Sequence, residues 1–122
     1  MSDLTTAPID QLVEACAGLD PPIAVTMNPA DVNPPGAWLN IDEIRTLTLA
    51  GDLQLRCSLY LIAPDQDPKR ALAILAPMLN RLRAVWEPDG PVVPQGVVLP
   101  DSPTPLPALR VPVHIHTESE VI

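Results

Sequence analysis

The sequence predicts an α+β fold: a mostly antiparallel β-sheet of about four to six strands, with an N-terminal helix and one long central helix packed on it. Two observations carry this prediction. From Leu53 to Leu61 the apolar residues stand at odd positions and the more polar residues at even positions, which is typical of a strand with one buried face. From Asp67 onward the apolar period changes to about 3.6 residues, which indicates an amphipathic helix.

The strand predicted over 53–61 places its apolar residues at odd positions and its polar residues at even positions. A three-residue loop, Ala50–Asp52, would pair Leu47 with Leu55 on one face. A two-residue loop would instead place apolar residues opposite polar ones. Because a slip of one residue turns every side chain to the other face, we favour the three-residue loop.

Upstream, residues 6–19 are predicted to form the first helix, since their apolar residues follow helical spacing and Pro21–Pro22 prevents its continuation. Ile23–Met27 reads as a short strand. Residues 37–49 are apolar at most odd positions, but Glu43 and Arg45 interrupt the pattern. We therefore expect a bulge or loop that divides this stretch into two strands.

The central helix is predicted from Pro68 to Val85, with Asp67 as its N-cap. Pro77 lies inside it and is expected to kink the helix without ending it. One apolar stripe should face the sheet. Its members are Leu72, Leu75, Leu79, Leu82 and Trp86, widened by Ala71, Met78 and Val85.

Two more strands are predicted, at Gln95–Leu99 and Ala108–Thr117. The last one alternates, with apolar residues inward at 109, 111, 113 and 115. Pro112 cannot donate to a ladder, which makes this an edge strand or one with an unpaired flank. An exposed edge is an assembly surface in an oligomer. The outward residues are our candidates for a subunit interface: Arg110, Pro112, His114 and His116.

Composition indicates a single globular domain over residues 1–122, since 47% of the residues are hydrophobic and 18% are charged. Residues 1–5 and 118–122 are expected to be flexible or bound to a partner. No apolar run approaches the length of a membrane span. Met1–Leu4 does not resemble the start of a secretory signal. We therefore expect a protein made in the cytoplasm, with no membrane partner.

The net charge of −8 comes from 15 acidic and 7 basic residues, and the bases form no run. This argues against a surface that grips nucleic acid through its phosphates. An acidic surface usually serves solubility. A more specific alternative is an acidic surface along which DNA slides without binding. Three aromatic residues also disfavour a platform for stacking bases.

Few side chains are spaced for chemistry. His114 and His116 would share a strand face, but the chain has no other histidine, so solvated side chains are the better interpretation. Asp65 and Asp67 are explained by turn formation and helix capping. Asp42–Glu43 has no companion nucleophile. Motifs for phosphate, dinucleotide or zinc chemistry are absent, so we expect no enzyme activity, cofactor or metal. Cys16 and Cys57 are expected to be buried thiols.

Several short segments carry a resemblance to a known family: Pro35–Ile41, the hairpin around Gly51, Leu53–Asp65, Arg70–Leu72, Leu99–Asp101 and Pro105–Leu109. In these segments the chain resembles the tail terminator (tail completion) proteins of long-tailed phages, especially those of actinobacterial phages. The likeness covers residues 5–117. The matching residues mark turns and the ends of elements and form no catalytic motif.

The resemblance implies a virion protein of which six copies form a ring at the head-proximal end of the tail tube. Such a ring stops tube polymerisation and binds the major tail tube protein and the head-completion connector, while DNA passes through its lumen without specific binding. An edge strand suits a head-to-tail ring, and acidic side chains would let DNA slide. Our candidates for the lumen are Asp42, Glu43 and Asp52.

Two alternatives stay open. Within the same class, the chain would be a stopper or adaptor of the head–tail connector. From a different class, it would be a small acidic, phage-encoded binding module.

Overall fold

The computed structural model describes residues 7–46, 53–100 and 103–117. The two ends expected to be flexible or partner-bound, and the loop Ala50–Asp52, lie outside these residues. Five strands and two helices confirm the predicted α+β class. The elements are α1 (Ala7–Ala17), β1 (Val25–Thr26), a 3₁₀ turn (Pro29–Asp31), β2 (Gly36–Thr46), β3 (Leu53–Ile62), α2 (Pro68–Arg83), β4 (Val93–Val97) and β5 (Leu106–Thr117).

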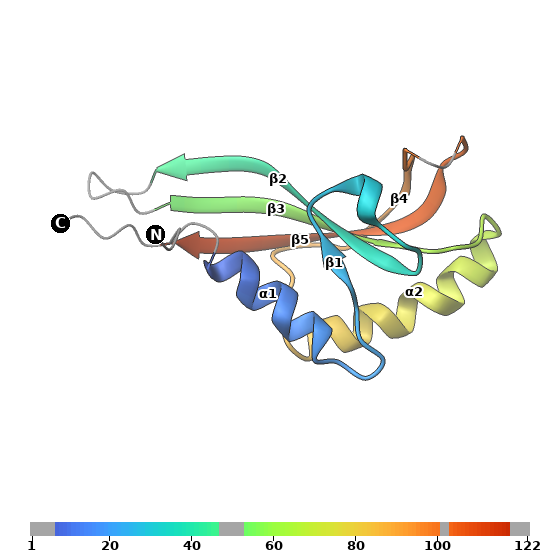
Figure 1. Cartoon of the computed structure of the whole chain (residues 1–122), viewed down its shortest axis with the longest axis horizontal. Helices are drawn as coiled ribbons and strands as arrows, with labels where there is room; N and C mark the ends of the chain where they lie inside the picture. The colour runs from blue at the N-terminus through green and yellow to red at the C-terminus, as the bar shows by residue number, and fades with distance from the viewer. Residues whose placement is uncertain (1–6, 47–52, 101–102, 118–122) are drawn as a thin grey trace.

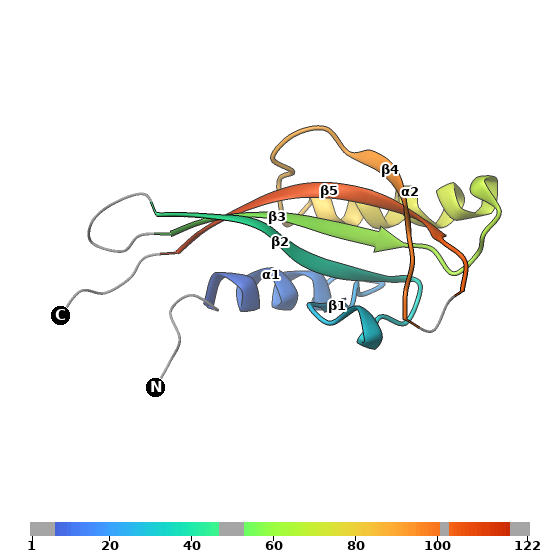
Figure 2. The same cartoon turned by 90° about the horizontal axis from the view of Figure 1, so that it is seen from above.

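The strands form one sheet in the order β1-β2-β3-β5-β4. All neighbours are antiparallel except β1 and β2, which are parallel. Both helices lie on the same face of the sheet (Figure 1). Figure 2 shows β2, β3 and β5 side by side, with their left-hand ends extending past the start of α1. The opposite face of the sheet, which we call the open face, carries neither α1 nor α2, and the 3₁₀ turn lies there beside Leu99 and Leu106.

β3 lies at the centre of the sheet, and its alternation is confirmed on the helix-facing side. Leu55, Cys57, Leu59 and Leu61 are buried in the main core with residues of α1, α2 and β5. The expected exposure of the other side is wrong for Ser58 and Tyr60, which are also buried. A second apolar cluster covers this part of the open face. Its members are Tyr60, Ile62, Val97, Leu99, Leu106 and Ala108, with Val32 and Trp38 packed against them.

β2 is one strand with a bulge, so the predicted bulge is confirmed and the predicted division into two strands is wrong. The predicted hairpin register is also wrong, because Leu55 pairs with Ile44 and Leu53 pairs with Thr46. The bulge explains the broken alternation of the sequence. The extra residue shifts the inward positions from odd to even, so Ile44 takes the register position that Glu43 would otherwise hold.

α2 runs through Pro77 as one helix, and Asp67 caps it by accepting the Arg70 N–H at 3.2 Å. Its apolar stripe is rotated from the predicted one. Leu72 is 58% exposed, because α2 buries the face centred on Ala71, Leu75, Met78 and Leu82. Helical positions 71, 75, 78 and 82 recur at the spacing of one narrow stripe.

β5 is not an edge strand along its whole length. It pairs with β3 from Ala108 to Thr117, and β4 covers its other flank only over Leu106–Arg110. The predicted alternative, a strand with an unpaired flank, is therefore the correct one for the part of β5 that follows Arg110. The inward residues at 109, 111, 113 and 115 are buried as predicted.

Candidate functional site

One end of the sheet is open at both edges. β1 pairs only with Ala37 and Trp38 of β2, and β4 reaches no further than Arg110 of β5. Beyond these points β2 and β5 continue to pair with β3, and no other described strand flanks them. We call this three-stranded part of the sheet the open end. It consists of residues 39–46, 53–58 and 111–117.

The outer edges of β2 and β5 in the open end are aligned with each other in the register of the sheet. Register places Thr46, Leu53 and Thr117 in line across the three strands. Strand edges present N–H and C=O groups that pair readily with another chain. The open end therefore offers two such edges side by side, one on β2 and one on β5.

Backbone direction shows which groups the β5 edge presents. The Asp89 N–H donates to the Pro112 carbonyl at 2.8 Å, so Pro112 directs its backbone groups away from β3. Residues two apart on a strand direct these groups to the same flank. His114 and His116 therefore direct their N–H and C=O groups to the flank that β4 leaves open.

The β2 edge can be assigned in the same way. The Ala37 N–H donates to the Ala24 carbonyl at 2.9 Å, outside the β2–β3 ladder. Leu39 and Ile41 follow Ala37 at intervals of two and face the same flank. After the bulge, Ile44 takes up this orientation, because its partner Leu55 directs its backbone groups toward Ile115 of β5.

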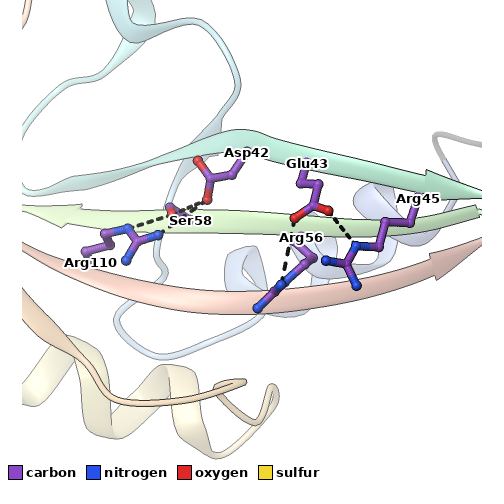
Figure 3. A network of polar contacts seen from close by, with 6 residues as sticks. All are labelled: Asp42, Glu43, Arg45, Arg56, Ser58 and Arg110. Carbon is purple, nitrogen blue, oxygen red and sulfur yellow. Dashed lines mark hydrogen bonds and ion pairs between the residues drawn. The ribbon is translucent and has the colours of Figure 1, made fainter.

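The bulge also brings two acidic residues to the open face. The register passes from Ile41 opposite Cys57 to Glu43 opposite Arg56, which leaves Asp42 as the extra residue. In a regular strand, consecutive side chains point to opposite faces. Here both Asp42 and Glu43 contact side chains of the open face (Figure 3).

Asp42 belongs to a network that joins three strands. Its carboxylate accepts the Ser58 hydroxyl at 2.5 Å and the Asn40 side-chain amide at 2.9 Å. Arg110 Nε donates to the same Ser58 oxygen at 2.8 Å, and Arg110 Nη2 lies 3.6 Å from Asp42. Ser58 is completely buried beneath these side chains. A buried hydroxyl with both a donor and an acceptor partner ties β2, β3 and β5 together.

Glu43 forms a second network beside the first. It accepts from Arg45 Nε at 2.5 Å and lies 3.7 Å from Arg56 Nη1 (Figure 3). The hydrogen bond from Arg45, together with the positive charges of Arg45 and Arg56, lowers the pKa of the Glu43 carboxyl below its ordinary value.

Two of the three acidic residues that we suggested for the lumen are bonded to arginines in the structure. Asp42 and Glu43 lie together on the open face, and each is paired with arginine: Asp42 with Arg110, Glu43 with Arg45 and Arg56. These ion pairs place three guanidinium groups and two carboxylates together on the open face, although the chain as a whole has a net charge of −8. Asp52, the third candidate, lies outside the described residues.

The four interface candidates divide into two pairs. Arg110 pairs with Val93 of β4, and the Pro112 carbonyl already accepts a hydrogen bond from the chain itself. His114 and His116 have exposed side chains and lie on the open part of β5. The structure therefore leaves the two histidines as the candidates that another chain could reach by strand pairing.

The remaining candidates for chemistry are the potential metal ligands and the Asp65–Asp67 pair. The described residues contain no group of three or more potential metal ligands. Asp65 and Asp67 form the turn and cap that were predicted, and Asp65 accepts the Asp67 N–H at 2.9 Å. That hydrogen bond, with Arg70 nearby, lowers the pKa of the Asp65 carboxyl.

The described residues also include two buried cysteines and several surface hollows. Cys16 and Cys57 are buried free thiols, as predicted, and burial raises the pKa of each to about 11. The hollow nearest the polar networks measures about 220 Å³ and is lined by residues that include Arg56, Asp89 and Arg110. A larger one, of about 440 Å³, lies between the end of α2 and the segment that follows it.

Sequence reasoning missed the centre of the site. Ser58 was assigned to solvent, and Arg45 and Arg56 were treated as scattered bases. One signal was available: adjacent charged residues that interrupt an alternating strand indicate a bulge, and a bulge places them on one face. The covering of Ser58 by side chains from two other strands required the three-dimensional register.

Comparison with family models, with curated proteins and with solved structures finds no match to this chain. Within the described ranges, neither helix combines the length and apolar character that a membrane crossing requires.

Proposed function

We propose that this chain is a structural virion protein of the tail terminator type. In this role, six copies form a ring that caps the head-proximal end of a phage tail tube and stops its polymerisation. The ring also provides the surface that joins the tail to the head. The role is non-enzymatic and places the protein in the virion, after synthesis in the host cytoplasm.

The observation that carries the proposal is the open end of the sheet, with unpaired edges on both β2 and β5. A monomer usually protects such edges, because they promote association. Two different edges on one molecule allow a head-to-tail contact, and such contacts close into a ring when the rotation permits.

Three of the segments that carry the family resemblance lie side by side in the structure. Pro35–Ile41 begins β2, Leu61–Asp65 follows the end of β3, and Pro105–Leu109 begins β5. Register brings these three together at the end of the sheet opposite the open end, since Gly36, Ile62 and Ala108 are in line. These three segments are therefore neighbours in the structure, whereas Arg70–Leu72 lies in α2.

The pairing of the arginines on the open face with carboxylates fits a passage for DNA. Arginines attract phosphates when they are free, but Arg45, Arg56 and Arg110 lie beside carboxylates. An arginine that lies beside a carboxylate gives less counterion release on meeting a phosphate, which weakens non-specific binding. In this proposal DNA slides through the lumen without being held.

Deletion of the gene from its phage, followed by negative-stain imaging, tests the proposal. A terminator is expected to leave tails of uncontrolled length that are detached from heads. Tails of normal length without heads would instead identify a stopper or adaptor of the connector. Complete virions that lack this chain would overturn both structural roles.

A further inference from the structure

We propose that neighbouring copies join by parallel pairing of the β5 edge of one copy with the β2 edge of the next, at the tip of the open end. This inference deepens the proposed function, on which it rests for the closed ring. It specifies the contact surface, its direction and the segments that make it.

The direction follows from the topology. β2 and β5 are each antiparallel to β3, so they run in the same direction. When copies join edge to edge and all face the same way, β5 of one copy must lie parallel to β2 of the next. Pairing of two identical edges by a two-fold axis would instead be antiparallel.

The position follows from the two short flanking strands. β1 and β4 both lie at the opposite end of the sheet and would stand between neighbouring copies there. Direct contact is therefore confined to the tip, where residues 43–46 and 114–117 are level. The copies diverge from this contact, and β1 and β4 occupy the space between them.

The side chains favour unlike edges over identical ones. On the open face the β2 edge carries Asp42, Glu43 and Arg45, whose side chains bond to one another and to β3 and β5, and the β5 edge carries the exposed imidazoles of His114 and His116. An imidazole N–H can donate to a carboxylate, which has room for several donors.

Cysteine cross-linking tests which edges meet. Arg45 and His116 are level, exposed and outside the core, so we choose Arg45→Cys and His116→Cys. The purified double variant, concentrated and treated with a short bismaleimide, is expected to give a ladder of linked chains. Each single variant and the wild type are expected to give none. A linked dimer from either single variant would overturn the inference, because it requires identical edges to meet.

A proline substitution tests the backbone contact. The His114 N–H points to the open flank, so His114→Pro removes a donor from the proposed interface without removing one from the β3–β5 ladder. We expect it to weaken self-association about tenfold or more, whereas His114→Ala, which keeps the N–H, changes it by less than about threefold. Circular dichroism checks that both variants stay folded.

The outcomes separate the two proposals. Self-association of His114→Pro at the wild-type level, or a wild type that stays monomeric at millimolar concentration, would overturn this inference. A double variant that associates without forming the ladder would also overturn it, and the ring would then use another surface. Complete virions after gene deletion would overturn the proposed function whatever edges the purified chain uses.

Discussion

The hydroxyl of Ser58 donates a 2.5 Å hydrogen bond to the carboxylate of Asp42, and this contact joins the central strand to the bulge of β2. A bulged residue lacks an opposite partner in the ladder. The side chain of Asp42 compensates by bonding to its neighbours. Arg110 of β5 donates to the same hydroxyl oxygen, so one buried hydroxyl connects both outer strands of the open end.

Replacing Ser58 with alanine should lower the free energy of unfolding by about 1–2 kcal/mol, because Asp42 and Arg110 each lose a partner. Both charged side chains are more than a third exposed, so water replaces part of the lost bonding. Urea unfolding measures the change. Gln54→Ala, on the same strand and face, is the control and should cost less than about 0.5 kcal/mol. Equal effects of the two substitutions would contradict the role given to Ser58.

The bulge of β2 could be predicted from the sequence, but the register of the hairpin could not. Glu43 and Arg45 interrupt an alternating strand, and that interruption predicted the irregularity correctly. It did not predict the pairing of Leu55 with Ile44, because the choice of loop assumed that Leu47 would face the core. Register depends on the whole sheet, and the strand positions on either side of a bulge change parity.

The rotation of the central helix about its axis could not be predicted from the sequence. Leu72 and Leu75 both fit a helical stripe, and periodicity alone could not rank them. The structure places Leu75 at 2% exposure and Leu72 at 58%. A stripe several residues wide leaves the helix free to rotate by tens of degrees, and packing against the sheet determines the final angle.

Leu75→Ala and Leu72→Ala form a matched pair that tests this rotation. The first removes buried methyl groups and leaves a cavity, so we expect it to cost about 2–5 kcal/mol. The second changes an exposed site and should cost less than about 0.5 kcal/mol. Denaturant titration of both variants compares them directly. A larger loss from Leu72→Ala would show that α2 packs on the face that the sequence stripe suggested.

Trp38 and Tyr60 stack in the cluster on the open face, with ring centroids 5.1 Å apart and an interplanar angle of 21°. The indole Nε1 also donates to the Met27 carbonyl at 3.2 Å. Trp38→Phe should keep an aromatic contact but lose this hydrogen bond, at a cost of about 1 kcal/mol. Trp38→Ala should cost about 3 kcal/mol or more. Similar losses in thermal or urea unfolding would mean that the stack contributes little.

The polar part of the site was harder to predict than the core. Burial of Cys16 and Cys57 follows from helical spacing and strand parity, which are local properties. The network around Ser58 joins residues that are 16 and 52 positions apart along the chain. Neither local spacing nor composition contains that information, so the pairing of Asp42 and Glu43 with arginines emerges only from the sheet register.

The buried cysteines make stability depend on alkaline pH. Burial raises the pKa of both thiols from an ordinary value of 9.0 to about 11, with the Asp42 charge adding to the effect at Cys57. The unfolded chain therefore loses these protons above pH 9, while the folded chain keeps them until about pH 11. The contribution is fully present below pH 9 and is lost as the pH rises to 11, by up to roughly 2–3 kcal/mol per thiol.

The free energy of unfolding, measured from urea titrations between pH 8 and pH 11, should fall more steeply for the wild type than for a Cys16→Ala/Cys57→Ala variant. Other groups that ionise in this range are the same in both proteins, so the difference between the two slopes isolates the thiols. The variant should be the less stable protein at neutral pH, because it loses buried side-chain volume. Parallel slopes would mean that the thiols ionise equally in the folded and unfolded states, which complete burial of Cys16 does not allow.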